Sequence, residues 1–218
     1  MKSIIKGKIV LITGGTGSIG QALVEKVVKF GAKKIIIFSN DENGLYEMES
    51  NLPDNSKIQY VIGDIRDPDT VSSIVKGIDI IFHAAALKHV DRCESIPFEA
   101  VTVNILGTKN IIKYSVSENV KKVIFISTDK AVNPFGVMGA TKLLAEKLIS
   151  AESLVNETVF ASVRFGNVLN TRGSIVPRIA KQIEKGGPIT LTDKRMKRFF
   201  MTKDEAVNLI LHATELSQ

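Results

Sequence analysis

Short runs of apolar residues recur along the chain, and segments with apolar residues at helical spacing lie between them. The runs are largely apolar at consecutive positions, which is typical of parallel strands buried on both faces. They cover residues 8–12, 34–38, 58–62, 78–82, 123–126 and 158–164, and a weaker run covers 189–192. Strands that alternate with helices predict an α/β fold, a doubly wound parallel sheet with helices on both faces.

The first run leads through a glycine-rich turn, Thr13-Gly14-Gly15-Thr16-Gly17-Ser18-Ile19-Gly20, into a helical pattern. Gly14 can form the tight turn, Gly17 lets the backbone approach a pyrophosphate, and Gly20 allows close packing of helix on strand. The N–H groups that begin the helix would then face the phosphates. The turn therefore predicts a Rossmann-type sheet that binds a dinucleotide through Gly14, Thr16, Gly17, Ser18 and Ile19.

The second strand is expected to end beside the adenosine ribose. An acidic residue there favours the free 2′-hydroxyl of NAD, and an arginine favours the 2′-phosphate of NADP. Ser39 and Asn40 are neutral, and Asp41 follows slightly later. We expect Ser39 and Asn40 to contact the cofactor, with a polar loop that only borders the ribose as the alternative. NAD and NADP both remain open.

The third and fourth strands end in further candidate cofactor contacts. Asp64 could accept a hydrogen bond from the adenine amino group, with Ile65 beside it, whereas Asp67 before a proline predicts a helix cap. The small residues after the fourth strand would let a flat cofactor lie against the backbone; they are Ala84, Ala85 and Ala86.

Two polar residues in apolar surroundings are expected to be structural. His83 ends the fourth strand, and Asn104 interrupts the apolar face of the helical pattern at 97–117. Buried polar side chains are hydrogen-bonded in most proteins. We expect a hydrogen-bonded imidazole at His83 and a bridge to the backbone at Asn104.

The fifth strand is followed by a cluster of hydroxyl-bearing and charged residues, Ser127-Thr128-Asp129-Lys130. A helical pattern begins further on, near Lys142. Charges at the end of a buried strand are costly unless they are paired or used. Ligands bind at this end of an open α/β sheet. Asp129 and Lys130 are therefore candidate catalytic residues, and a surface ion pair of small energetic value is the alternative.

Composition limits the partners that we expect. The chain has 218 residues, 44% of them hydrophobic, and its only cysteine is Cys93, which suggests a reducing, cytoplasmic location without disulfides. No apolar run approaches the ~20 residues of a membrane span. The net charge of +6 is spread without a basic tract, which argues against nucleic acid and suits an anionic small ligand. One cysteine and three histidines do not predict a metal site.

The blocks described so far, with 83–90, 139–142, 164–168 and 172–177, resemble the extended short-chain dehydrogenase/reductase superfamily. Within it the chain is similar to the polysaccharide-biosynthesis group of UDP-N-acetylglucosamine 4,6-dehydratases, and the block from Ser127 to Ala131 is specific to that group. The resemblance implies a dehydratase that acts on a UDP-amino sugar through transient hydride transfer to bound NAD or NADP. It also implies a homo-oligomer.

The resemblance assigns roles to individual residues. Lys130 would take the proton from carbon 5 of the sugar, Asp129 would protonate the leaving hydroxyl, and Thr128 would hold the 4-hydroxyl. Lys142 would bind the nicotinamide ribose and lower nearby pKa values. Candidate substrate contacts are Lys88, Asn167 and Arg198, the last from a basic segment that is either a clamp for a diphosphate or a solvated loop.

Two departures from the family pattern define the alternatives. Met138 occupies the place of a catalytic tyrosine, as in part of this group, and a thioether cannot accept a hydroxyl proton. Members also continue into a substrate-binding region, so we expect a dinucleotide-binding domain at 1–185 and, at 186–218, the start of a region that is largely absent. A UDP-sugar 4-epimerase and a cofactor-binding but inactive homologue remain as alternatives.

Overall fold

The computed structural model describes residues 1–52, 56–171, 173–191 and 193–217. Six parallel strands form one sheet in the order β3-β2-β1-β4-β5-β6. Their bounds are β1 Ile9–Thr13, β2 Lys34–Ser39, β3 Ile58–Ile62, β4 Ile80–His83, β5 Lys122–Ile126 and β6 Val159–Val163. This order is that of the doubly wound dinucleotide-binding fold. The prediction of a Rossmann-type sheet is therefore confirmed, and the six main apolar runs are its strands.

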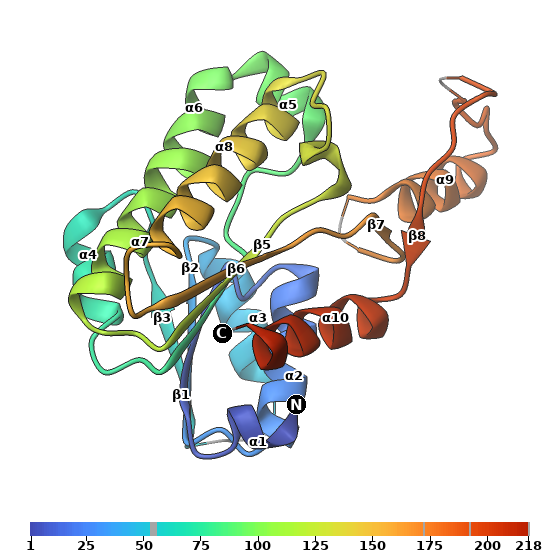
Figure 1. Ribbon diagram of the computed structural model, residues 1–218. Helices are drawn as coiled ribbons and strands as arrows, with labels where there is room; N and C mark the ends of the chain where they lie inside the picture. Colours follow the sequence, from blue (N-terminus) through green and yellow to red (C-terminus); the bar gives the residue numbers. More distant parts are fainter. Residues whose placement is uncertain (53–55, 172, 192, 218) are drawn as a thin grey trace.

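Helices cover both faces of the sheet (Figure 1). One face carries α2 (Ser18–Lys29), α3 (Glu42–Asn51) and α10 (Lys203–Leu216). The other carries α4 (Pro68–Ile74), α7 (Thr108–Ser117) and α8 (Val137–Glu152). Successive strand residues point to opposite faces, so Ile35 and Ile37 join the first core and Ile36 and Phe38 the second. Each such buried side chain contributes about 1.5–3 kcal/mol by leaving water.

The remaining helical segments are short. They are α1 (Lys2–Ile5), α5 (Val90–Ser95), α6 (Pro97–Val101), a π-helical turn at Thr102–Gly107 and a 3-10 turn at Asp129–Ala131. The pattern at 97–117 thus forms one helical rod in which a π-helical turn joins α6 to α7. A π-helical turn carries more residues than an α-helical one, and such turns are frequent at functional sites.

Residues 167–201 form an arm that leaves the sheet at the end of β6 (Figure 1). It contains β7 (Asn167–Val168), α9 (Ile175–Glu184) and β8 (Phe200–Met201), and β7 pairs with β8 in parallel. No residue of α9 is buried. The expected strand at 189–192 is wrong for 189–191, which belong to no strand and where Ile189 and Leu191 lie 52% and 65% exposed. Thr192 lies outside the described residues.

Helix α10 returns from the arm to the sheet domain and packs on α2 (Figure 1). Thr202 and Glu205 form a capping box at its start, which satisfies two backbone N–H groups. Val207, Ile210 and Leu211 are fully buried in the core beneath it. The boundary at 185/186 stays a prediction: it would group α10 with part of the arm, although the apolar face of α10 completes the sheet's core.

Candidate functional site

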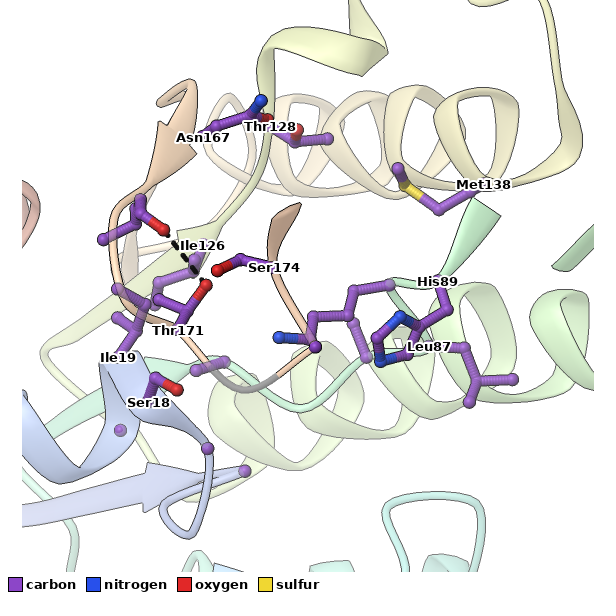
Figure 2. A pocket seen from close by; sticks show the side chains of 18 of the residues that line it. Ser18, Ile19, Leu87, His89, Ile126, Thr128, Met138, Asn167, Thr171 and Ser174 are labelled. Atoms are coloured by element: carbon purple, nitrogen blue, oxygen red, sulfur yellow. Dashed lines mark hydrogen bonds between the residues drawn. The ribbon is translucent and has the colours of Figure 1, made fainter. Parts of the chain in front are cut away.

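A cavity of about 900 Å³ opens at the carboxyl ends of the strands. It lies where the strand order reverses between β1 and β4, the place where doubly wound sheets bind ligands. One side consists of the loops after β1 to β6 together with α2 and α8, which we call the sheet wall, and the other consists of the arm. Figure 2 shows Ser18 and Ile19 of α2 on the sheet wall and Thr171 and Ser174 of the arm.

The glycine-rich turn after β1 has the close contacts that the sequence predicts. Gly14 has a φ of +66°, and a Cβ atom on it would lie 2.7 Å from the backbone nitrogen of Ala85. A Cβ on Gly20 would lie 2.5 Å from the carbonyl oxygen of Gly14, so helix and turn are as close as backbones can pack. Gly17 begins α2 without a side-chain cap, and Ser18 and Ile19 line the cavity. The first N–H groups of α2 are thus available to an anion.

The ends of β2 and β3 form the acidic end of the cavity. The Ser39 hydroxyl lies 2.8 Å from that of Thr16 and accepts a hydrogen bond from the Asp41 backbone at 3.1 Å. The Asp41 carboxylate caps α3 by accepting from the Gly44 N–H at 3.0 Å. Asn40 lines the cavity beside them, as do Asp64 and Ile65 from the end of β3.

Asp64 has a partner that the sequence did not reveal. Arg66 donates to its carboxylate from Nε at 3.0 Å and from Nη2 at 2.7 Å, and a second edge of the guanidinium donates to Glu99 at 2.7 Å. The hydrogen bond from Arg66 lowers the pKa of the Asp64 carboxyl. Asp64 therefore stays ionised and can still accept a hydrogen bond from a ligand, while Arg66 is held away from the cavity. Asp67 caps α4 as predicted.

The loop after β4 runs through Ala84, Ala85 and Ala86 along the cavity and is fixed from the helical rod behind it. The Asn104 amide accepts from the Leu87 N–H at 2.8 Å and donates to the Leu87 carbonyl at 3.1 Å. Its Nδ2 also donates to the Thr141 hydroxyl at 3.0 Å. Asn104 is thus the backbone bridge that the sequence predicts, and it lies in the π-helical turn.

His83 is structural, as predicted. Its Nδ1 lies 2.7 Å from the Thr13 hydroxyl and its Nε2 lies 3.0 Å from that of Thr108. Burial, and secondarily the charge of Lys142, lower the pKa of the imidazole to about 3. A neutral, doubly hydrogen-bonded ring of this kind holds β1, β4 and the helical rod together.

Lys142 projects from α8 into the back of the cavity. Its Nζ donates to the Ile126 carbonyl at 2.6 Å and lies 3.9 Å from the centre of the Phe125 ring. Burial lowers the pKa of the ammonium to about 7, although the carboxylate of Glu146 acts in the opposite direction. The hydroxyl of Ser127 is buried beside the cavity and close to the Glu146 carboxylate, whose pKa it helps to lower.

The residues after β5 form a hydrogen-bonded cluster at the junction of sheet wall and arm. The Lys130 Nζ donates to Asp129 Oδ1 at 3.0 Å and to Asn167 Oδ1 at 3.1 Å. The Thr128 hydroxyl donates to the same Asp129 oxygen at 3.0 Å. Thr128, Lys130 and Asn167 line the cavity, and Asp129 joins it through its two neighbours. Figure 2 shows Thr128 and Asn167 side by side on one flank.

Met138 lines an apolar corner of the cavity, where Cys93 and Ala100 pack against it. Only 4% of its surface is exposed, and Figure 2 shows it across the cavity from Asn167. A thioether in this corner packs against its apolar neighbours and offers no group that could transfer a proton.

The remaining predicted contacts lie near the arm. Lys88 and Arg198 both line the cavity. Sequence reasoning missed Arg178 and Gln182, which line it from α9. Their signal in the sequence is the amphipathic pattern of α9, which predicts a helix without showing which side chains face a ligand. Arg172, part of the motif at 172–177, lies outside the described residues.

Two further features concern the described residues as a whole. No group of three or more histidine, cysteine, aspartate or glutamate side chains among them could hold a metal ion. None of the helices described is long and apolar enough to cross a membrane.

Relatives share this sequence over nearly its full length. An uncharacterized membrane protein of Methanocaldococcus jannaschii is 50% identical over 100% of this chain and 66% of its own length. A UDP-glucose 4-epimerase of Rickettsia canadensis is 42% identical over 95% of this chain and 63% of its own length. The chain thus spans less than two thirds of the length of these relatives.

The fold is also that of a solved structure. The X-ray structure of Pen from Bacillus thuringiensis matches with a TM-score of 0.96 and 44% identity, over 99% of this chain and 69% of that one. Residues 10–218 match the family described as polysaccharide biosynthesis protein. The resemblance drawn from the motifs is confirmed, and the chain belongs to the polysaccharide biosynthesis protein family.

Proposed function

We propose that the protein modifies a nucleotide sugar with a bound nicotinamide dinucleotide, and that the reaction is the 4,6-dehydration of UDP-N-acetylglucosamine. The observation that carries the proposal is the Asp129–Lys130–Asn167 cluster, which borders the same cavity as Lys142 and the uncapped start of α2. An acid and a base thus lie beside a cavity with the features of a dinucleotide site.

Several features support a dinucleotide in this cavity. The start of α2 and the crowded glycine turn fit a pyrophosphate, because backbone N–H groups face it and no side chain intervenes. Ser127 adds a buried hydroxyl to the cavity lining. Lys142, held by the Ile126 carbonyl, would donate to the hydroxyls of the nicotinamide ribose. When bound, the nicotinamide supplies reversible hydride transfer.

Lys130 and Asp129 would divide the proton transfers of the elimination. Lys130, in its neutral form, would remove the proton from carbon 5 of a 4-keto sugar. Asp129, in its protonated form, would give a proton to the hydroxyl that leaves carbon 6 as water. The hydrogen bond between their side chains lets a proton pass from Lys130 to Asp129, which prepares both for these roles. Thr128 would hold the 4-hydroxyl, because its own hydroxyl lies in the cavity wall beside Asp129.

A UDP-sugar 4-epimerase is the second candidate. The Rickettsia relative carries that name and is 42% identical. Epimerisation needs hydride removal and return at carbon 4, without the elimination for which the Asp129–Lys130 pair is suited. The presence of this pair at the cavity is why we favour the dehydratase.

One assay distinguishes these functions. The protein is incubated with UDP-N-acetylglucosamine and either NAD or NADP, and the product mass is followed by mass spectrometry. Loss of one water from the sugar supports the dehydratase. An unchanged mass with a new 4-epimer supports the epimerase, and bound dinucleotide without turnover identifies an inactive homologue.

A further inference from the structure

Glu146 is a buried carboxylate that the proposed reaction does not use. It lies on α8 one helical turn after Lys142, and 6% of its surface is exposed, against 5% for Lys142. Side chains at this spacing are neighbours on one face of a helix. A carboxylate in such a place is costly unless hydrogen bonds and opposite charge compensate it. The groups around Glu146 therefore indicate what it does.

Arg164, which follows β6, fixes the orientation of the Glu146 carboxylate. Its Nε donates to Oε1 at 2.8 Å and to Oε2 at 3.1 Å, and its Nη2 also donates to Oε2. A guanidinium that binds a carboxylate through two nitrogens restricts its geometry as well as stabilising its charge. Neither residue is among the described residues that line the cavity. The pair thus lies behind the cavity wall.

The other neighbours of the carboxylate belong to the cavity wall itself. Burial raises the pKa of Glu146, but Arg164, the nearby Ser127 hydroxyl and the charge of Lys142 together lower it. The carboxyl group is therefore ionised at neutral pH. Ser127 and Lys142 both line the cavity. A fixed negative charge thus lies directly behind two residues that face a ligand.

Lys142 depends on this charge, because its surroundings disfavour an ammonium. Burial lowers the pKa of Lys142 to about 7, and the charge of Glu146 acts in the opposite direction. The other titratable groups that the structure describes around it do not replace Glu146. His83, from the end of β4, is neutral, since burial and the charge of Lys142 lower its pKa to about 3. Asp129, after β5, is paired with Lys130 at 3.0 Å.

We propose that Glu146 is a positioning residue that keeps the Lys142 ammonium charged and thereby sustains its hold on the dinucleotide. Glu146 acts through Lys142 and does not touch the ligand. The proposal rests on the dinucleotide site of the proposed function, in which Lys142 donates to the ribose hydroxyls. An ammonium group offers only donors, so its loss of a proton weakens that contact. Arg164 holds Glu146 in place and partly offsets its charge.

The first test follows the titration of Lys142 by NMR, in protein with isotopically labelled lysine and without dinucleotide. The Lys142 resonance is identified by its absence from Lys142→Met. In Glu146→Gln, which keeps the size of the side chain, the titration midpoint should fall by about one pH unit or more. In Arg164→Met the carboxylate loses the cation that offsets it, so the midpoint should rise. An unchanged or raised midpoint in Glu146→Gln would overturn the proposal. If that variant does not fold, an unchanged or lowered midpoint in Arg164→Met would do so.

The second test measures dinucleotide affinity against pH by the fluorescence of NADH or NADPH, in a chain without tryptophan. Affinity should fall as the pH rises through the midpoint of Lys142, and at lower pH in Glu146→Gln than in the unaltered protein. Glu146→Asp retains the charge and should restore most of the difference. A purely structural role would weaken binding equally at every pH, and that result would overturn the proposal.

The two tests separate this proposal from the function on which it rests. If the unaltered protein binds neither dinucleotide at any pH, the proposed function fails and the link to a ligand fails with it. The NMR titration still decides, without a ligand, whether Glu146 holds the charge of Lys142.

Discussion

The two sides of the cavity are built differently. On the sheet wall, charges are paired in buried places: Arg164 donates to Glu146 with two nitrogens, and the Glu146 side chain is only 7% exposed. In the arm the equivalent pair is Arg195 with Asp193, and the Arg195 side chain is 90% exposed. The buried pair on the sheet wall therefore contributes to the structure, whereas the exposed pair in the arm contributes little to stability. The core of the fold preforms the dinucleotide half, whereas the arm contributes contacts without adding to the core.

The largest expected effect lies where the two sides meet. Lys130→Ala removes the proposed base and its contact with Asn167. We expect dehydration to slow about 10²- to 10⁴-fold, the usual effect of a positioned proton-transfer group, while dinucleotide binding stays as it is. Turnover is measured by product mass, with Lys147→Ala on the exposed face of α8 as the control. Full dehydration by Lys130→Ala would refute the assignment of the base.

The next effect tests how tightly the sheet wall is packed. Gly14 and Gly77 have similar positive φ angles, +66° and +70°, so alanine costs both about 1–2 kcal/mol in backbone energy. A Cβ on Gly14 would meet Ala85 at 2.7 Å, whereas one on Gly77 would meet nothing within 4 Å. Gly14→Ala should therefore lower the free energy of unfolding by about 2 kcal/mol more than Gly77→Ala. Urea denaturation measures the free energy of unfolding of both variants. Equal losses of this free energy would mean that the backbone around Gly14 and Ala85 can move apart without cost.

The two ion pairs, Arg164–Glu146 and Arg195–Asp193, should differ in their contribution to stability. Burial acts to raise the pKa of Glu146, but the hydrogen bonds and positive charges around the carboxylate, with Arg164 foremost, together outweigh it, so the carboxyl pKa is lowered. Arg164→Met leaves that charge unpaired and should cost about 2 kcal/mol, less than for a fully buried pair because Arg164 is itself 44% exposed. Arg195→Met should leave the melting temperature unchanged. If thermal unfolding shows the two variants to be alike, the contrast between sheet wall and arm is wrong.

A pH dependence gives a separate test of the sheet wall. The pKa of Lys142 is lowered from 10.5 to about 7 by burial, so between these values the unfolded state binds more protons than the folded state. The contribution of Lys142 to the free energy of unfolding should therefore rise with pH across that window and be constant below it. Denaturation of the protein and of Lys142→Met at about pH 7 and about pH 10 measures the difference. The protein should gain free energy of unfolding relative to Lys142→Met between the lower and the higher pH. If it does not, the pKa of Lys142 is not lowered by burial.

The sheet was predictable from the sequence, whereas the arm was predictable only in part. Consecutive apolar residues in strands buried on both faces leave a strong pattern, as at 34–38, and the glycine turn can be interpreted by steric limits alone. His83 and Asn104 were assigned correctly because a buried polar group needs partners. Strands of two residues such as β7 and β8 leave no period to detect, and the apolar residues at 189–191 suggested a strand although they lie at the surface. The engagement of Asp64 by Arg66 depends on side-chain geometry in a loop, for which the sequence has no pattern.

The π-helical turn at Thr102–Gly107 makes the cavity sensitive to the length of a helix rather than to its composition. Asn104 fixes the loop after β4 by two hydrogen bonds to Leu87, so the rotation of the rod sets the position of that loop. Removing one residue from the turn would restore ordinary α-helical winding and rotate everything before it by about 100° relative to α7. Substitutions on the rod can be absorbed one side chain at a time, whereas a single-codon deletion there would displace a whole edge of the cavity.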